Sequence, residues 1–421
     1  MHNYFEEIKK SLKKLISIPS VEGKPDGDKP FGKDVYDALD YTLSLAQSLG
    51  FETVNYDNYI GEAVYGEGED LAILVHLDVV PAGKLSEWKH PPFSATEENG
   101  RIYGRGAMDD KGPAITCLYA MKALKDQGFV PKKKIKLIFG CNEESGWKCI
   151  EHYKKVAKFP DYGFSPDADF PVLYAEKGIL HVEFSFPVPE KIAFLKGGDR
   201  VNMVCDRVEA VAPFDRKAAE KYGVKTENGK LVTLGKSAHG STPEKGVNAL
   251  RPMLAYLEEA AGLPETARKY LFEDALSLKS LSDDTGRLTM SPDVAEIRDG
   301  KLFITVDFRY PSTADGQKIL DTLKQISDYT VISHQLPLYN DKNGFLIQTL
   351  LSVYNETTGE HAEPIAIGGG TYARALKEGT AFGPQMAGEE ETIHQPNEYV
   401  TEENLRLQFI MYKEAIRRLS E

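Results

Sequence analysis

The sequence has few cysteines and no long apolar run, and each absence excludes a class of protein. Its 421 residues contain four cysteines, none of them in a C-x-x-C pair: Cys117, Cys141, Cys149 and Cys205. This excludes a disulfide scaffold and favours a reducing compartment. No run of about 18 apolar residues occurs, so we expect no membrane span. The N-terminal segment also lacks the apolar core of a signal peptide. These absences predict a cytoplasmic protein.

Positive charge is also scarce relative to negative charge. Lys and Arg number 51 against 64 Asp and Glu, which gives a net charge of −13. A protein this acidic repels phosphate backbones and anionic lipid surfaces, so we expect neither a nucleic acid nor a membrane as a partner. Hydrophobic residues make up 41% and charged residues 27% of the chain, a globular balance. The composition leaves open whether some of the carboxylates are gathered for chemistry.

Strands and helices alternate in the first part of the chain. LAILVH (71–76) and KIKLIFG (134–140) are short apolar runs typical of buried strands, and helical patterns occupy 34–49 and 112–127. This alternation predicts an α/β layer with a mostly parallel central sheet.

The pattern changes near residue 181. HVEFSF (181–186) and LFITVDFRY (302–310) alternate apolar and polar residues, as strands with one solvated face do. We therefore expect an α/β domain built from residues 1–180 and 339–421, interrupted by an α+β domain at 181–338.

Histidines and carboxylates follow the predicted strands, where sites form in open α/β sheets. His76 and Asp78 lie two residues apart at the end of one strand, and Glu143 and Glu144 follow another. Two adjacent carboxylates repel each other unless a cation lies nearby. A polar strand end and a solvated acidic turn remain the alternative interpretations.

Three further candidates lie elsewhere in the chain. Asp109 and Asp110 sit among glycines in GRGAMDDKGP, Asp167 follows in PDADFP, and His394 lies near the C-terminus. The alternatives are a pair of helix-capping aspartates, a turn aspartate and a loop histidine. Taken together, two histidines and at least three carboxylates suit zinc, with manganese or cobalt as substitutes. A shareable aspartate suits two metals. No phosphate-binding loop, G-x-S-x-G elbow or H-E-x-x-H is present.

These pieces, in this order, resemble the two-metal metallopeptidase family of aminoacylases, carboxypeptidase G and bacterial dipeptidases, and its peptidase V-type dipeptidases most of all. The matching segments cover nearly the whole chain: LISIPSV (15–21), HLDVVPAG (76–83), W-x-x-P-P-F (88–93), GRGAMDDKG (104–112), NEESG (142–146), PDADFP (166–171), NMV (202–204), SAHGSTPEKGVNA (237–249), VDFRYP (306–311), GGGTYAR (368–374) and His394.

The resemblance implies a fold and a metal centre. The fold is a phosphorylase/hydrolase-like α/β catalytic domain with an inserted ferredoxin-like lid. Two divalent ions, zinc first, would be held by five residues, with Asp109 shared between them: His76, Asp109, Glu144, Asp167 and His394. Asp78 would support His76 or tune the base. The peptide bond between Asp109 and Asp110 would be cis.

The resemblance also implies roles in catalysis and substrate binding. Glu143 would be the general base and acid of peptide hydrolysis. Candidate substrate contacts are Asn202, His239, Arg309, Gly369, Gly370 and Thr371. Arg309 would bind the substrate carboxylate with its planar fork, and an ion pair with Asp307 is the alternative. The lid would have to close over the metals.

The expected activity is hydrolysis of dipeptides with a free N-terminus, because in this family an aspartate at the position of Asp167 accompanies such substrates. Two alternatives stay open: an N-acyl amino acid deacylase, such as a succinyl-diaminopimelate desuccinylase, and an inactive binding protein of the same fold. The resemblance to peptidase V-type dipeptidases, in which such extra lid sequence keeps the protein monomeric, implies a monomer rather than a homodimer.

Overall fold

The computed structural model describes residues 4–421, which form two compact units. Of the described residues, the first unit comprises 4–174, 340–365 and 371–421, and the second comprises 175–339 and 366–370. Residues 175–180, 339 and 366–370, which the sequence placed with the first unit, belong to the second. None of the helices within 4–421 is long and apolar enough to span a membrane.

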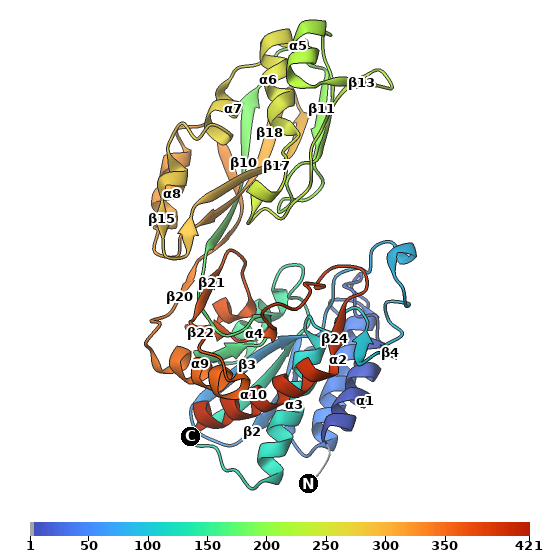
Figure 1. Cartoon of the computed structure of the whole chain (residues 1–421), viewed down its shortest axis with the longest axis vertical. Coiled ribbons are helices and arrows are strands. Elements are labelled where there is room, and N and C mark those ends of the chain that lie inside the picture. The colour runs from blue at the N-terminus through green and yellow to red at the C-terminus, as the bar shows by residue number, and fades with distance from the viewer. Residues whose placement is uncertain (1–3) are drawn as a thin grey trace. The chain divides into compact units, whose positions relative to one another are not determined.

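A six-stranded sheet with a parallel middle forms the centre of the first unit (Figure 1). Its order is β1 (Glu52–Tyr56), β2 (Ile60–Tyr65), β6 (Lys134–Gly140), β3 (Asp70–His76), β7 (Tyr162–Ser165) and β22 (Glu378–Ala381). The last four strands are parallel, and β1 and β2 add an antiparallel edge. From Leu71 onward every residue of β3 is buried, as expected for a strand covered on both faces. The predicted α/β class is confirmed.

Six helices belong to this unit: α1 (Tyr4–Ile16), α2 (Lys33–Ser48), α3 (Lys111–Asp126), α4 (Lys148–Val156), α9 (Phe345–Thr358) and α10 (Glu402–Ser420). Gly61 of β2 lies against Leu39 and Leu43 of α2, while its neighbour Glu62 accepts a hydrogen bond from Tyr153 of α4. Successive strand residues point to opposite faces, so α2 and α4 cover opposite faces of the sheet. Helix α3 lies between α1 and α10 (Figure 1).

Short strands tie the loops of the first unit together. One three-stranded sheet pairs β24 (Tyr399–Thr401), β5 (Arg101–Tyr103) and β4 (Thr96–Glu98), and a two-stranded one pairs β23 (Pro384–Gln385) with β8 (Ala168–Asp169). The pairing of β24 with β5 joins the two segments that carry His394 and Asp109. All four cysteines are buried free thiols, as expected for a chain without disulfides.

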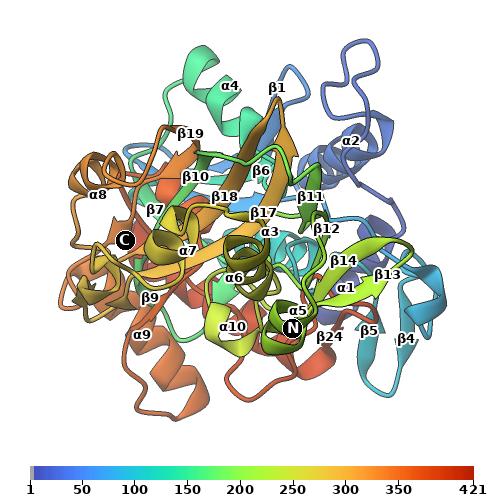
Figure 2. The same cartoon turned by 90° about the horizontal axis from the view of Figure 1, so that it is seen from above.

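An eight-stranded antiparallel sheet forms the second unit. Its order is β13 (Lys225–Glu227), β14 (Lys230–Leu234), β12 (Arg207–Val211), β11 (Phe194–Gly197), β17 (Thr289–Arg298), β18 (Lys301–Tyr310), β10 (Gly178–Pro187) and β19 (Tyr329–Gln335). Helices α5 (Arg216–Tyr222), α6 (Leu250–Ala261) and α7 (Thr266–Leu271) lie over the sheet (Figure 2), and α8 (Gly316–Leu323) completes the helical layer.

The core of the second unit follows the alternation in its strands. Val182, Phe184, Ile304 and Val306 pack with Leu254 of α6 in one buried cluster. The unit is α+β, as expected. Its ferredoxin-like character stays a prediction.

The chain passes between the units four times, after residues 174, 339, 365 and 370. A small sheet marks these crossings, with β9 (Leu173–Glu176) between β20 (Leu338–Tyr339) and β21 (Ile365–Ile367). Because β9 and β21 each begin in one unit and end in the other, both are continuous backbone links between them.

Candidate metal centre

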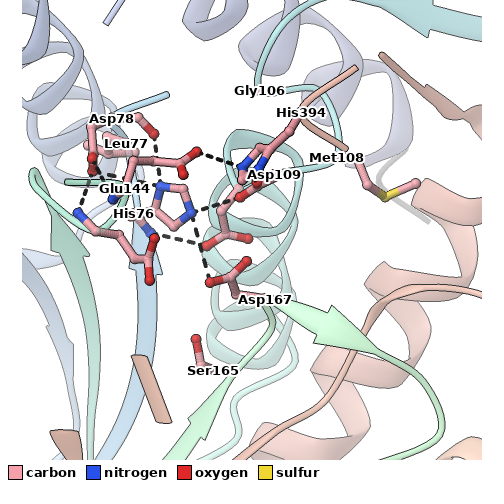
Figure 3. Close-up of polar contacts among 12 residues, drawn as sticks. His76, Leu77, Asp78, Gly106, Met108, Asp109, Glu144, Ser165, Asp167 and His394 are labelled. Atoms are coloured by element: carbon pink, nitrogen blue, oxygen red, sulfur yellow. Dashed lines mark hydrogen bonds and ion pairs between the residues drawn. The ribbon is translucent and has the colours of Figure 1, made fainter. Parts of the chain in front are cut away.

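Neighbouring parallel strands bring the predicted ligands to one edge of the first sheet. β3 ends at His76, β6 ends two residues before Asn142, and β7 ends two residues before Asp167. The three strands are hydrogen-bonded neighbours with parallel direction, so their carboxyl ends meet at the same edge. Figure 3 shows His76, Asp78, Asp109, Glu144, Asp167 and His394 converging there.

His76 has a defined tautomer. Its Nδ1 lies 2.8 Å from the carbonyl oxygen of Asp78, and a carbonyl can only accept, so Nδ1 carries the proton. A neutral His76 therefore presents a lone pair at Nε2. That Nε2 lies 2.8 Å from Asp109 Oδ1 and 3.9 Å from Asp167 Oδ2. Two acceptors this close repel each other unless a proton or a metal cation lies between them.

Asp109 faces a histidine on each side. Its Oδ1 lies by His76, and its Oδ2 lies 2.8 Å from His394 Nε2, which is also 3.1 Å from Glu144 Oε1. His76 is 1% exposed and Asp109 7%, whereas the side chain of His394 is 47% exposed. The predicted set is thus brought together as two histidine–carboxylate groups that share Asp109.

Asp78 holds the acidic turn that follows β6. One carboxylate oxygen accepts from the backbone N–H of Glu143 and the other from the N–H of Glu144, each at 3.0 Å. The Asp78 carboxylate lies 3.7 Å from His76 Nδ1, so its contact with that histidine runs through the backbone carbonyl. Asp78 therefore fixes the backbone of two candidate residues at once.

The loop before α3 needs glycine at two points. Gly106 has φ +87°, a left-handed conformation that glycine adopts without steric cost. At Gly112 a Cβ would lie 2.3 Å from the carbonyl oxygen of Ala107. The peptide bond between Asp109 and Asp110 is cis, as the resemblance implied. The backbone therefore requires glycine at two of the three glycine positions around the aspartate pair, Gly106 and Gly112.

The buried carboxylates perturb one another and the histidines. Burial, together with the negative charges of Glu144, Asp78 and Asp109, raises the pKa of Glu143 to about 8, even though His76 opposes it. Burial and the charge of Asp109 also raise the pKa of Asp167 well above its usual range. Several buried carboxylates at one place are unstable as anions without compensating positive charge.

The neighbouring carboxylates also raise the pKa values of the two histidines, so the site favours positive charge. Burial lowers the pKa of His394, but the hydrogen bonds and charges of Asp109 and Glu144 outweigh it and raise that pKa to about 11. Burial of His76 is likewise outweighed, chiefly by Asp109, and its pKa lies well above the usual value.

The donor set fits divalent cations. Two triads each bring one ligand atom per residue within 4.8 Å of one another: His76, Asp109 and Glu144, and His76, Glu143 and Asp167. Imidazole nitrogens and carboxylate oxygens are the ligands that zinc and manganese share. A cation between the Nε2 lone pair and the facing carboxylates would remove the repulsion described above.

Two candidate substrate residues lie together in the second unit. Asn202 accepts a hydrogen bond from the Gly240 N–H at 2.7 Å through its backbone carbonyl. His239 lies next to Gly240 in the chain, and its Nδ1 is 2.7 Å from Ser241 Oγ. Both Asn202 and His239 are exposed, so their side chains are accessible to a ligand.

Arg309 is already engaged on one edge. Its Nε and Nη2 donate to Asp307 at 2.8 Å, so the ion pair considered from the sequence is present. Its Nη1 donates to the carbonyl oxygen of Gly368 at 3.2 Å, which brings the Gly-rich loop beside it. Thr371 belongs to the first unit, where its side chain accepts from the Ala373 N–H.

Three residues orient the site in ways that the sequence did not predict: Asp110, Trp147 and Tyr372. Asp110 Oδ2 accepts from the His76 backbone N–H at 3.1 Å, and the Trp147 indole donates to Glu143 Oε1 at 3.2 Å. Tyr372 packs edge-on against both His76 and Trp147. Asp110 had a signal in the paired aspartates of its motif, whereas nothing in the sequence separated Trp147 from an ordinary surface tryptophan.

Comparison with known proteins gives a family and close relatives. The model of peptidase family M20/M25/M40 matches residues 72–418. A putative dipeptidase, YtjP, of Bacillus subtilis (strain 168) is 35% identical, with 99% of this chain and 97% of the relative covered. The Beta-Ala-Xaa dipeptidase of Lactobacillus delbrueckii subsp. lactis is 34% identical, with 99% and 96% covered.

Solved structures share the fold at lower identity. Human carnosine dipeptidase 1 matches with a TM-score of 0.63 and 15% identity, covering 99% of this chain and 96% of that one. The M20 family metallo-carboxypeptidase Sso-CP2 of Sulfolobus solfataricus matches with a TM-score of 0.62 and 21% identity, covering 98% and 99%.

Proposed function

This chain belongs to peptidase family M20/M25/M40, as its motifs predicted, and from that premise we propose that it is a metal-dependent dipeptidase acting on short peptides with a free N-terminus. The curated relatives that match it over nearly their whole length are named as dipeptidases. The observation that carries the proposal is Asp109, whose two oxygens face His76 and His394, each beside a further carboxylate.

We propose two divalent ions, zinc first and manganese or cobalt as substitutes. His76 and Asp167 would hold one ion and Glu144 and His394 the other, with Asp109 shared. Metals bound here would supply Lewis acidity, which lowers the pKa of a water and polarises the scissile carbonyl.

Glu143 would move the proton. Its carboxylate lies within the same group as His76 and Asp167, and the Trp147 N–H holds one of its oxygens. Glu143 would accept a proton from the attacking water and return it to the leaving amine nitrogen. Asp78 would keep Glu143 in place through the backbone N–H that it accepts.

In the second unit, Asn202, His239 and Arg309 would contact the substrate, with the backbone of Gly369 and Gly370 beside them and Thr371 next in the chain. To bind a substrate carboxylate in fork geometry, the Arg309 guanidinium would have to exchange the contact between its Nη1 and the Gly368 carbonyl for that carboxylate. The monomer stays a prediction, which sedimentation of the purified chain would test.

The test compares substrates and metals. The purified chain, stripped with a chelator and reloaded with zinc, manganese or cobalt, is assayed on free dipeptides and on N-acyl amino acids. We expect metal-dependent cleavage of the free dipeptides. Activity on acylated substrates alone would favour the deacylase, and no activity with any metal would favour a binding protein; the dipeptidase relatives favour neither. Anomalous scattering from metal-loaded crystals should give two peaks flanking Asp109, and a single peak would refute the two-metal assignment.

A further inference from the structure

Glu398 is a buried carboxylate outside the predicted metal centre. It is 0% exposed, and among the residues that the structure describes its carboxylate is hydrogen-bonded within the segment 105–109, which carries Asp109. One oxygen, Oε1, accepts from the backbone N–H groups of Met108 at 3.0 Å and Asp109 at 3.2 Å. The other, Oε2, accepts from the Gly106 N–H at 3.1 Å and from Arg105 Nη1 at 2.7 Å.

This is more than charge compensation for a buried acid. One ion pair with Arg105 would balance the charge, yet three backbone N–H groups of one loop also converge on the two oxygens. A carboxylate that accepts several N–H bonds fixes the backbone that donates them. The donor nearest to the chemistry is Asp109 itself, whose side chain faces both histidines.

The same contacts reach the segment of His394. Arg105 Nη1 also donates to the carbonyl oxygen of Gln395 at 3.2 Å, and the Gly104 N–H donates to the carbonyl oxygen of Glu398 at 2.9 Å. Residues 104–109 and 394–398 are therefore joined at three points: the backbone of Gly104, the guanidinium of Arg105 and the carboxylate of Glu398. Asp109 and His394 lie on these two joined segments.

We propose that Glu398, together with Arg105, is a positioning residue that sets the separation of Asp109 and His394 and thereby the affinity of the metal centre. This inference rests on the proposed function, because it takes Asp109 and His394 to be ligands. Both carboxylate oxygens of Glu398 accept from donors of residues 105–109, so Glu398 would act on the metal centre through the backbone of Asp109. Outer partners of this kind alter metal affinity or activity by about 10–100-fold when they are replaced.

The test uses the isosteric variant Glu398→Gln in the full chain. The amide keeps one acceptor oxygen but turns an NH2 group toward other donors, so the loop loses its fixed position. We expect the affinity for zinc and manganese, measured by competition with a chromophoric chelator, to fall about 10–100-fold. At limiting metal, kcat should fall by a similar factor while KM for a dipeptide stays within about threefold, and excess metal should restore part of kcat. Glu363→Gln is the matched control, since Glu363 is exposed in the same unit.

Several outcomes separate the possibilities. The proposal is overturned if Glu398→Gln folds and keeps the metal affinity and kcat of the unaltered chain. It is also overturned if the melting temperature falls while the metal affinity is unchanged, because that result indicates a purely structural role. If Glu398→Gln does not fold, Arg105→Lys keeps the charge but replaces the planar guanidinium with a shorter side chain that ends in one nitrogen, and unchanged affinity in that variant also overturns the proposal. Failure of the unaltered chain to bind metal or cleave dipeptides counts against the proposed function instead.

Discussion

Asp78→Asn is the substitution whose effect the structure defines most closely. Asp78 is 1% exposed, and its two oxygens accept one backbone N–H each, from Glu143 and Glu144. Burial raises the pKa of its carboxyl to about 6, so at pH 8 the group is ionised. Asparagine has the same shape but only one acceptor oxygen, so one of the two N–H groups would face an NH2 group.

The magnitude follows from those two contacts. A hydrogen bond to a charged group contributes about 1.5–3 kcal/mol, and a buried donor left without a partner costs about 1–3 kcal/mol. In the variant one of the two hydrogen bonds is lost, and the other is no longer made to a charged group. We therefore expect the turn to lose about 2–5 kcal/mol of stabilisation. If the loss is confined to the turn at 142–146, it raises the barrier for hydrolysis, and about 3 kcal/mol corresponds to a drop in kcat of about 10²-fold.

The assay follows dipeptide hydrolysis at pH 8 with saturating metal, alongside thermal unfolding. We expect kcat to fall about 10²-fold with a modest loss of melting temperature, because the turn is local. Asp40→Asn is the control, since Asp40 is exposed on α2. A kcat for Asp78→Asn within about threefold of the unaltered enzyme would refute the reasoning, since a turn held by these two bonds could not tolerate it.

Three further predictions follow from other residues. Glu143→Gln keeps the contact with Trp147 but cannot take a proton, so kcat should fall about 10²–10⁴-fold while the variant still binds metal in the competition assay. Gly112→Ala places a Cβ 2.3 Å from the Ala107 carbonyl, so the loop must shift, and both melting temperature and metal affinity should fall; retention of both would show that the loop yields freely. Burial raises the pKa of Asp293 to about 8, so between about pH 4 and 8 the native state holds a proton that the unfolded state has lost, and stability falls as pH rises. Asp293→Asn should flatten that slope in pH-dependent melting curves, and an unchanged slope would exclude Asp293 as its origin.

The sequence predicted the site best where a metal-ligating residue type lies at the end of a recognisable strand. His76 and the Glu143–Glu144 pair could be predicted near each other because they lie at the ends of the predicted strands 71–76 and 134–140, and the ends of parallel strands gather at one edge. The strand before Asp167, β7, was not predicted. The antiparallel edge made by β1 and β2 was not predicted, since short strands with mixed burial carry little pattern.

Other features depend on contacts that no local pattern encodes. Glu398 binds backbone N–H groups that lie up to 292 residues away along the chain, and a backbone group leaves no trace in residue identity. Arg309 posed a similar difficulty. The alternation of its strand predicted a solvated polar face, but Arg309 is 4% exposed and is paired with Asp307 on the same face. The Gly-rich segment at 366–370 joined the second unit through the pairing of β21 and a carbonyl contact, neither of which sequence distance reveals.

The four crossings between the units have a consequence for how the protein is made. The second unit is nearly continuous in sequence, from residue 175 to 339, whereas the first waits for β22, His394, Glu398 and α10. During synthesis, domains fold as units when their residues emerge. The second unit can therefore fold before the first, although the chain of the first begins earlier. A nascent chain that has not yet reached residue 394 would hold His76, Asp109 and Asp167 without His394. With the ligand set proposed above, the discontinuous order of segments would therefore make the metal centre a later product of synthesis than the fold of the second unit.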